Sequence, residues 1–211
     1  MKTDDLIGML ATGAGPAPRA VAARRLLPVM LGGLAASALL AVGVIGLVPT
    51  ALFADGAWWT KFTYSAALAM ALAWPVARLA RPVARTRAPW QLVGAVVVAM
   101  ALLGLWQLAR IEPGARMDDF LGHSWAVCPW NILLLSLPAM GGTFWALRGL
   151  APTRPRAAGL AAGLLAGAVA ATGYALSCTE LSMAFVATWY PLGIGLAGAL
   201  GALLGPRVLR W

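Results

Sequence analysis

Tyr174-Ala-Leu-Ser-Cys178-Thr-Glu180-Leu-Ser-Met-Ala-Phe-Val-Ala-Thr-Trp189-Tyr190 is a stretch in which a long apolar run breaks briefly into polar residues and then resumes. The break holds one of the two cysteines and one of the seven acidic residues of the chain. The pair Trp189-Tyr190 follows, and aromatic residues gather where helices enter a membrane. The stretch therefore predicts two membrane-spanning helices joined by a short polar connection.

The composition of the whole chain predicts an integral membrane protein. Of 211 residues, 61% are hydrophobic and 11% charged, and the mean hydropathy is +0.81, which leaves too little polar surface for a soluble domain. A span needs about 20 apolar residues. We predict an all-α fold, with a segment 1–25 followed by one transmembrane domain, 26–211. Its six predicted spans are Leu26–Val48, Phe62–Leu79, Trp90–Leu108, Pro129–Leu147, Ala157–Ser177 and Met183–Leu204.

Basic residues orient the predicted spans. With a cytoplasmic N-terminus, 13 of the 16 Lys and Arg residues fall inside, and Lys61, Arg110 and Arg116 fall outside. This distribution follows the positive-inside rule, so both termini are predicted to be cytoplasmic. The net charge of +9 is explained by arginines in short loops beside anionic lipid head groups. We expect no direct binding of nucleic acid.

The N-terminal segment begins with a short amphipathic pattern. Thr3 suits a helix cap and the acids Asp4 and Asp5 suit a first helical turn. The apolar residues Leu6, Ile7 and Leu10 are spaced to form one face. Taken alone, the residues favour a turn lying on the membrane surface. The alternative is a docking peptide that binds a cytoplasmic protein as a helix in a groove.

The longest outer loop, Arg110–Val127, leads to the first cysteine. Three acids, the single histidine, His123, and Cys128 lie within 17 residues there. One interpretation is a solvated loop beside a small buried cysteine. The other is a metal site, because Cys, His and carboxylates are ligands of soft or borderline divalent metals. The spacing matches no standard zinc pattern.

The two cysteines are predicted to lie at the same depth in the membrane. The fourth and fifth spans form an antiparallel hairpin around the inner loop Arg148–Arg156, so their outer ends are neighbours. Cys128 lies 20 residues before Arg148, and Cys178 lies 22 residues after Arg156. At 1.5 Å per residue, both lie about 30 Å from the inner surface. The chemistry alone fits a structural disulfide as well as it fits a sensing pair.

Glycines recur every four residues in the fifth span, at Gly159, Gly163 and Gly167, and small residues recur in the sixth. This spacing lets helix backbones approach closely. We predict tight packing between these two helices of one chain, in preference to a dimer interface.

Several chemistries are disfavoured by what the chain contains. One histidine is too few for a pair of haem ligands, and no Gly-x-Ser-x-Gly or phosphate-binding loop occurs. No ionisable residue lies in the middle of a predicted span, where a coupled transporter needs one. We therefore expect no enzyme and no resident cofactor. The runner-up function is a small transporter or metal-handling permease, for which the sequence offers no polar path.

Six motifs along the whole chain carry a resemblance to a known family. They are Met1-Lys2-Thr3-Asp4-Asp5-Leu6-Ile7, Trp125-Ala-Val-Cys128, Arg148-Gly-Leu-Ala-Pro-Thr-Arg-Pro155, Tyr174-Ala-Leu-Ser-Cys178-Thr-Glu180, Trp189-Tyr190-Pro-Leu-Gly193 and Arg210-Trp211. In these the chain resembles the NrsF-type family, "negative regulator of sigma F". One departure is Ser177, where the family pattern has histidine before the second cysteine.

The resemblance implies a six-span anti-sigma factor of the bacterial inner membrane. Such a protein holds an extracytoplasmic-function sigma factor inactive on the cytoplasmic side until paired cysteines sense an outside stress such as heavy metal. It implies that Cys128 and Cys178 bind a thiophilic divalent metal, with Glu180 and His123 as candidate additional ligands, or switch between thiol and disulfide.

The same resemblance favours the docking interpretation of the N-terminal segment. The candidate residues for binding the sigma factor are then Asp4, Asp5, Leu6, Ile7 and Leu10.

Overall fold

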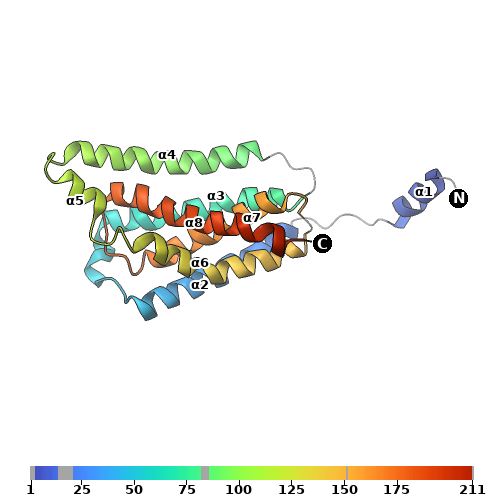
Figure 1. Ribbon diagram of the computed structural model, residues 1–211, viewed down its shortest axis with the longest axis horizontal. Coiled ribbons are helices and arrows are strands. Elements are labelled where there is room, and N and C mark those ends of the chain that lie inside the picture. Colours follow the sequence, from blue (N-terminus) through green and yellow to red (C-terminus); the bar gives the residue numbers. More distant parts are fainter. Residues whose placement is uncertain (1–2, 14–20, 82–85, 151, 211) are drawn as a thin grey trace.

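Helices make up the regular structure of the residues that this computed structural model describes, 3–13, 21–81, 86–150 and 152–210 (Figure 1). The all-α prediction is confirmed for these ranges. The elements are α1 (Thr3–Gly13), α2 (Val21–Val44), the 3-10 helix η1 (Thr50–Ala54), α3 (Gly56–Leu79), α4 (Arg87–Arg110), α5 (Arg116–Leu121), α6 (Cys128–Arg148), α7 (Pro155–Tyr174) and α8 (Met183–Val208).

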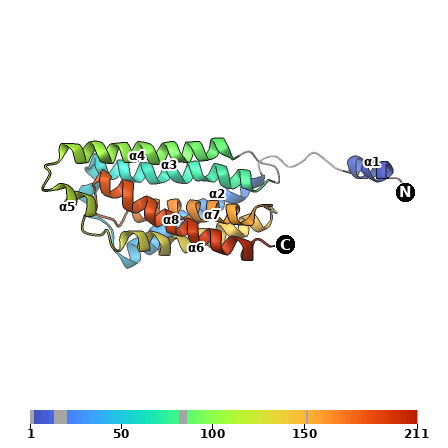
Figure 2. The same ribbon diagram turned by 45° about the horizontal axis from the view of Figure 1, so that its top comes forward.

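The long helices lie side by side in one bundle (Figure 2). Among the described residues, five of them, α2, α4, α6, α7 and α8, are long and apolar enough to cross a membrane. The helix α3 is as long as α4, with 24 residues. It is less apolar, however, because it carries Lys61 near its start and Arg78 near its end. It coincides with the predicted span Phe62–Leu79, which stays a prediction.

Helix boundaries differ from the apolar runs by several residues. The helix α2 begins at Val21, before the predicted Leu26, and ends at Val44. Just beyond it Gly46 has a φ of 103°, a left-handed conformation that favours glycine and ends helices. The helix α7 likewise ends at Tyr174, before the predicted Ser177. Hydropathy locates apolar side chains, whereas backbone hydrogen bonds decide where a helix stops.

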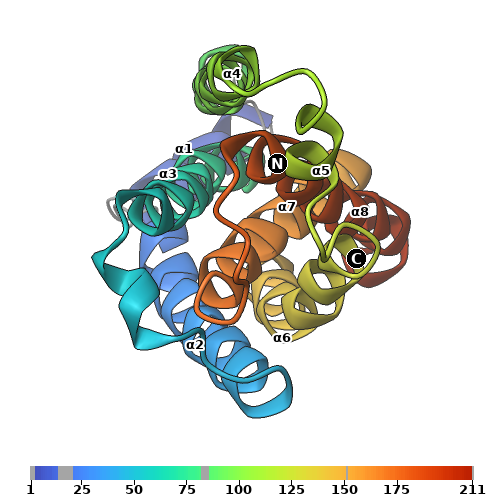
Figure 3. The ribbon, with the colours of Figure 1, turned by 90° about the vertical axis from the view of Figure 1, so that its left-hand side faces the viewer.

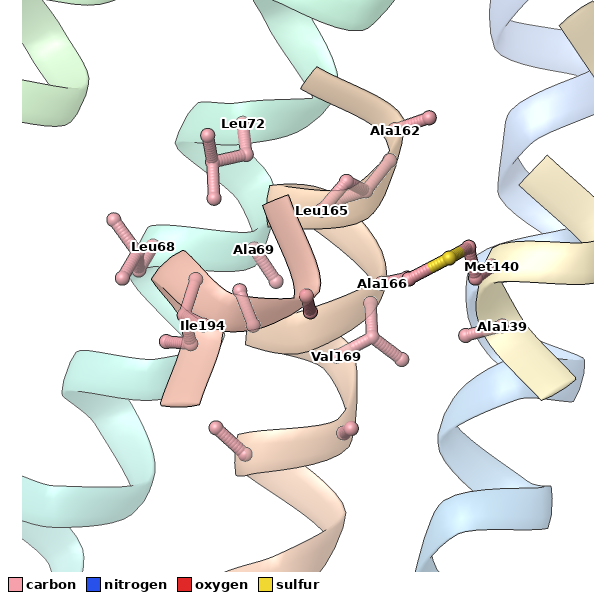
Figure 4. Packing of buried hydrophobic residues seen from close by; sticks show 14 of the residues in the cluster. Leu68, Ala69, Leu72, Ala139, Met140, Ala162, Leu165, Ala166, Val169 and Ile194 are labelled. Atoms are coloured by element: carbon pink, nitrogen blue, oxygen red, sulfur yellow. The ribbon is translucent and has the colours of Figure 1, made fainter. Parts of the chain in front are cut away.

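The helix α7 is the centre of the bundle, as the end view in Figure 3 shows. It packs against α2, α3, α6 and α8. Its central side chains lie between α3 and α6 in Figure 4. On the α3 side are Leu68 and Leu72, and on the α6 side are Ala139 and Met140.

Small residues bring α7 and α8 into backbone contact. A Cβ atom on Gly159 would collide with the Gly201 carbonyl, and one on Gly163 would collide with the Ala197 carbonyl. A Cβ atom on Gly167 would stand 2.9 Å from the Cα atom of Ile194. The prediction of tight packing within one chain is confirmed.

Gly163→Ala is therefore expected to destabilise the bundle by about 2 kcal/mol, because overpacking a well-packed interface costs about 1–3 kcal/mol. The control is Gly195→Ala on α8, where a Cβ atom would meet nothing within 4 Å. Thermal unfolding in detergent should show a lower midpoint for Gly163→Ala than for the control. Equal midpoints would mean that this contact is not tight in solution.

The two ends of the bundle differ in chemistry. We call one the arginine end. It carries the described residues Arg24, Arg25, Arg78, Arg81, Arg87, Arg148, Arg154, Arg156, Arg207 and Arg210. The other, which we call the cysteine end, comprises η1, α5, the first residue of α6 and the connection between α7 and α8. The positions of α5 and of the C-terminus in Figure 1 mark these opposite ends.

Candidate functional site

The connection between α7 and α8, residues 175–182, forms the middle of the cysteine end. It leaves α7 through a turn in which the amides of Ser177 and Cys178 both donate to the Tyr174 carbonyl, at 2.9 and 3.0 Å. It ends at Ser182, which caps α8 by accepting from the Phe185 amide. The turn directs Cys178 back toward the bundle.

The two thiols meet at this point. Cys128 is the first residue of α6, Cys178 lies in the connection, and their side chains form a hydrogen bond. Both are free thiols, with exposed fractions of 0% and 3%. The hydrogen bond from Cys128, helped by the nearby Lys61 ammonium, lowers the pKa of the Cys178 thiol to about 6.

Two tyrosines enclose the thiol pair. The rings of Tyr174 and Tyr190 lie 6.2 Å apart and both are buried. The Tyr174 hydroxyl interacts with Cys128 and accepts a hydrogen bond from Asn131 at 3.4 Å. The Tyr190 hydroxyl faces Cys178 but makes no hydrogen bond of good geometry. The site thus holds a buried hydroxyl with unused hydrogen-bonding capacity.

Three donors from α3 and the segment before it hold the connection in place. The Val48 amide donates to the Leu176 carbonyl at 2.9 Å. The Trp58 indole donates to the Ala175 carbonyl at 3.0 Å. The Lys61 ammonium donates to the carbonyls of Cys178 and Glu180, at 2.5 and 3.0 Å.

Glu180 and His123 are neighbours, but the Glu180 carboxylate binds the outer loop and the His123 ring lies in solvent. The Glu180 carboxylate accepts from the backbone amides of His123 and Ser124 at 2.8 and 3.1 Å. The His123 ring is fully exposed, with Nδ1 4.0 Å from the carboxylate. Gly122 has a φ of 57°, and a Cβ atom there would stand 2.7 Å from Glu180 Oε2. Glu180 therefore fixes the outer loop to the connection.

The described part of the chain contains no preformed group of three or more His, Cys, Asp and Glu side chains that would hold a metal. Of the four residues suggested as metal ligands, the structure brings together the thiols of Cys128 and Cys178. The backbone of Glu180 lies near the thiols, because its carbonyl and that of Cys178 both accept a hydrogen bond from the Lys61 ammonium group. The His123 ring points away.

The N-terminal docking segment forms α1, which extends three residues beyond the expected Leu10 to Gly13. Within the described residues, α1 packs against no other helix. The side chain of Ile7 is 59% exposed, and Asp4 and Asp5 are exposed as well. The side chains of Leu6 and Leu10 lie outside the described set.

Lys61 and Tyr190 are among the site residues that sequence reasoning does not find. Lys61 directly precedes an apolar run, and a lysine at the start of a predicted span is the one feature of the sequence that could point to it. Tyr190 was interpreted as an interfacial aromatic, but it is fully buried beside Cys178. Its neighbour Trp189 is partly exposed and donates to the Phe120 carbonyl at 3.0 Å.

The fold and the site define a small helical protein with long helices that are apolar enough to cross a membrane. It has a buried thiol pair at one end and an arginine-rich opposite end. The family model described as "Negative regulator of sigma F" matches residues 10–211, and the chain belongs to this NrsF family.

Two curated relatives match the whole chain over their own full lengths. The "Probable anti-sigma-F factor NrsF" of Azospira oryzae is 40% identical over 214 residues. The "Anti-sigma-F factor NrsF" of Caulobacter vibrioides is 41% identical over 216 residues. No solved structure matches the chain. The family model starts at residue 10, so the first nine residues lie outside it but within the reach of the two full-length matches.

Proposed function

We propose that this protein is an anti-sigma factor of the bacterial inner membrane. In this proposal it sequesters an extracytoplasmic-function sigma factor on the cytoplasmic side. It releases that factor when Cys128 and Cys178 bind a heavy metal or are oxidised on the periplasmic side. Six helices cross the membrane, with α3 as the sixth, and both termini are cytoplasmic.

The observation that carries the anti-sigma role is the full-length similarity to two proteins named anti-sigma-F factors, at 40% and 41% identity. The charge distribution supports the orientation, since basic residues gather at the arginine end. The helix α1 precedes α2, whose first residue lies at that end. An exposed apolar side chain such as Ile7 is then available to a cytoplasmic partner.

The thiol pair supports the sensing role. Two adjacent thiols can each lose a proton and bind one soft divalent metal ion through sulfur. They can also form a disulfide, transferring two electrons and two protons to a thiol oxidant. The Tyr190 hydroxyl, which lacks a well-placed partner, can donate a hydrogen bond to a sulfur once the pair has changed state.

The location of the thiols supports transmission of a structural change from the cysteine end to the arginine end of the bundle. Cys128 starts α6, and Cys178 lies between α7 and α8, so a bond or metal bridge between them pulls the ends of three helices together. These helices end or begin at Arg148, Pro155 and Val208. At the arginine end, Arg148 already donates to the Val208 carbonyl at 2.7 Å. A shift of α6 against α7 and α8 therefore alters the surface offered to the sigma factor.

The alternative of a transporter has little support in the described residues. Lys61 is the one charged side chain among them that is buried, and it lies near the start of α3. A polar path through the middle of the bundle would be expected of a coupled transporter.

Purification of the full-length tagged protein from native membranes tests the anti-sigma role. Mass spectrometry of the co-purified material should identify a sigma factor, and high salt should weaken its retention if the arginine end contributes. A preparation that retains no sigma factor, while metal ions move across vesicles containing the protein, would favour transport.

A further inference from the structure

Lys61 is a buried cation in an unusual setting. Its side chain has an exposed fraction of 0%, and no carboxylate of the described chain lies within ion-pair distance of its ammonium group. Removing a charged group from water is costly unless hydrogen bonds compensate it. The compensation comes from the carbonyls of Cys178 and Glu180, at 2.5 and 3.0 Å.

These two carbonyls flank the thiol segment. Cys178 carries one of the thiols, and the Glu180 side chain holds the outer loop through the amides of His123 and Ser124. One ammonium group on α3 thus ties down both the thiol residue and the residue that fixes the loop in front of it. While these bonds exist, Cys178 stays packed against Cys128.

Because the thiols are buried, the hydrogen bonds from Lys61 affect how easily a solute reaches them. With exposed fractions of 0% and 3%, the thiols react with a solute only after the segment opens locally. The rate of reaction depends on the free energy of that opening. Hydrogen bonds to a charged group contribute more to such a free energy than neutral ones do.

We propose that Lys61 is a positioning residue that holds residues 175–182 closed over the thiol pair and sets how readily metal ions and oxidants reach it. The physiological meaning of this closure rests on the proposed sensing function. The closure itself is a property of the bundle, and it is measurable without a sigma factor.

Thiol labelling of Lys61→Met tests the proposal. The chain has two cysteines, so the rate at which N-ethylmaleimide labels the purified full-length protein reports on this site alone. Methionine fills a similar volume without donating hydrogen bonds. We expect labelling at pH 9 to accelerate by about tenfold or more, because hydrogen bonds to a charged group are lost from the closed state only. The alkaline pH offsets the opposing effect of removing the ammonium group, which lowers the pKa of the Cys178 thiol in the original chain. Lys61→Gln, which keeps a donor for one carbonyl, should give an intermediate rate.

Ser65→Ala is the matched control. Ser65 is buried on the same helix and donates to the Lys61 carbonyl at 2.6 Å, so its loss weakens α3 without touching the connection. Its labelling rate should stay close to that of the original chain. If Lys61→Met and Lys61→Gln label no faster than Ser65→Ala at matched thermal stability, Lys61 is a structural residue and the proposal is wrong.

The proposed sensing function fails on a different result: variants that lack the thiols still respond to metal in cells as the original chain does. The labelling rates of the Lys61 variants would be unaffected by that result, so the two ideas stand or fall independently.

Discussion

Cys178→Ser is expected to leave repression intact and to abolish induction of a sigma-dependent reporter by Cd²⁺ or by a thiol oxidant. Serine is slightly smaller and suits the buried position, so the fold should be retained. Its hydroxyl is a hard donor that binds soft metals poorly and forms no disulfide. Reporter output in a strain carrying this variant should stay at the uninduced level at every inducer concentration that the cells tolerate.

The adjacent substitution Ser177→Ala is the control, because Ser177 is buried with a hydroxyl that has no partner and its loss keeps both thiols. Induction in this control should match that of the original chain. A Cys178→Ser strain that responds normally would show that the thiol pair is not the sensor.

The double substitution Leu6→Asp and Leu10→Asp is expected to release the sigma factor. Apolar anchors of this size contribute about 1.5–3 kcal/mol each when buried in a partner, so losing two should weaken binding by at least about 100-fold. The reporter should then be active without inducer. Binding of purified sigma factor to the full-length protein in detergent measures the same change directly.

Thr12→Asp provides the comparison for this pair. Thr12 lies in the same helix α1 on the side away from the apolar face, and its hydroxyl bonds only carbonyls of its own helix. It adds a charge without removing an anchor, so repression should persist. Full repression by the Leu6 and Leu10 variant would place the contact in the loops of the arginine end instead.

Much of the fold is predictable from the sequence because long apolar runs have few stable structures in lipid. Backbone groups must satisfy one another there, so such runs become helices. The boundary of α7 was less predictable. Ala175 and Leu176 continue the apolar run, yet the helix ends at Tyr174. It ends there because the amides of Leu176 and Ser177 donate to the carbonyls three residues back, those of Gly173 and Tyr174, and not to the carbonyls four residues back.

The meeting of Cys128 and Cys178 is predictable for a geometric reason. Two antiparallel helices of nearly equal length must bring their far ends to the same height, whatever their side chains. The orientation of His123 does not follow from such a rule. It depends on a loop that Glu180 holds by backbone amides, which leaves the imidazole ring in solvent.

The role of Lys61 lay beyond sequence reasoning for a different reason. Its acceptors are 117 and 119 residues away in the chain, and their approach depends on how α3 packs against α7. No local pattern around Lys61 reports that packing. Tyr190 is similar, because an aromatic residue at the start of a span suits the membrane interface as well as it suits a buried site.

The most direct test of the account is release of the sigma factor from the purified full-length protein by Cd²⁺. The complex is immobilised through a tag on the membrane protein, and the retained sigma factor is measured before and after the metal is added. The account predicts release from the original chain and full retention by the Cys128→Ser, Cys178→Ser double variant. Retention by both proteins, or equal release from both, would contradict it.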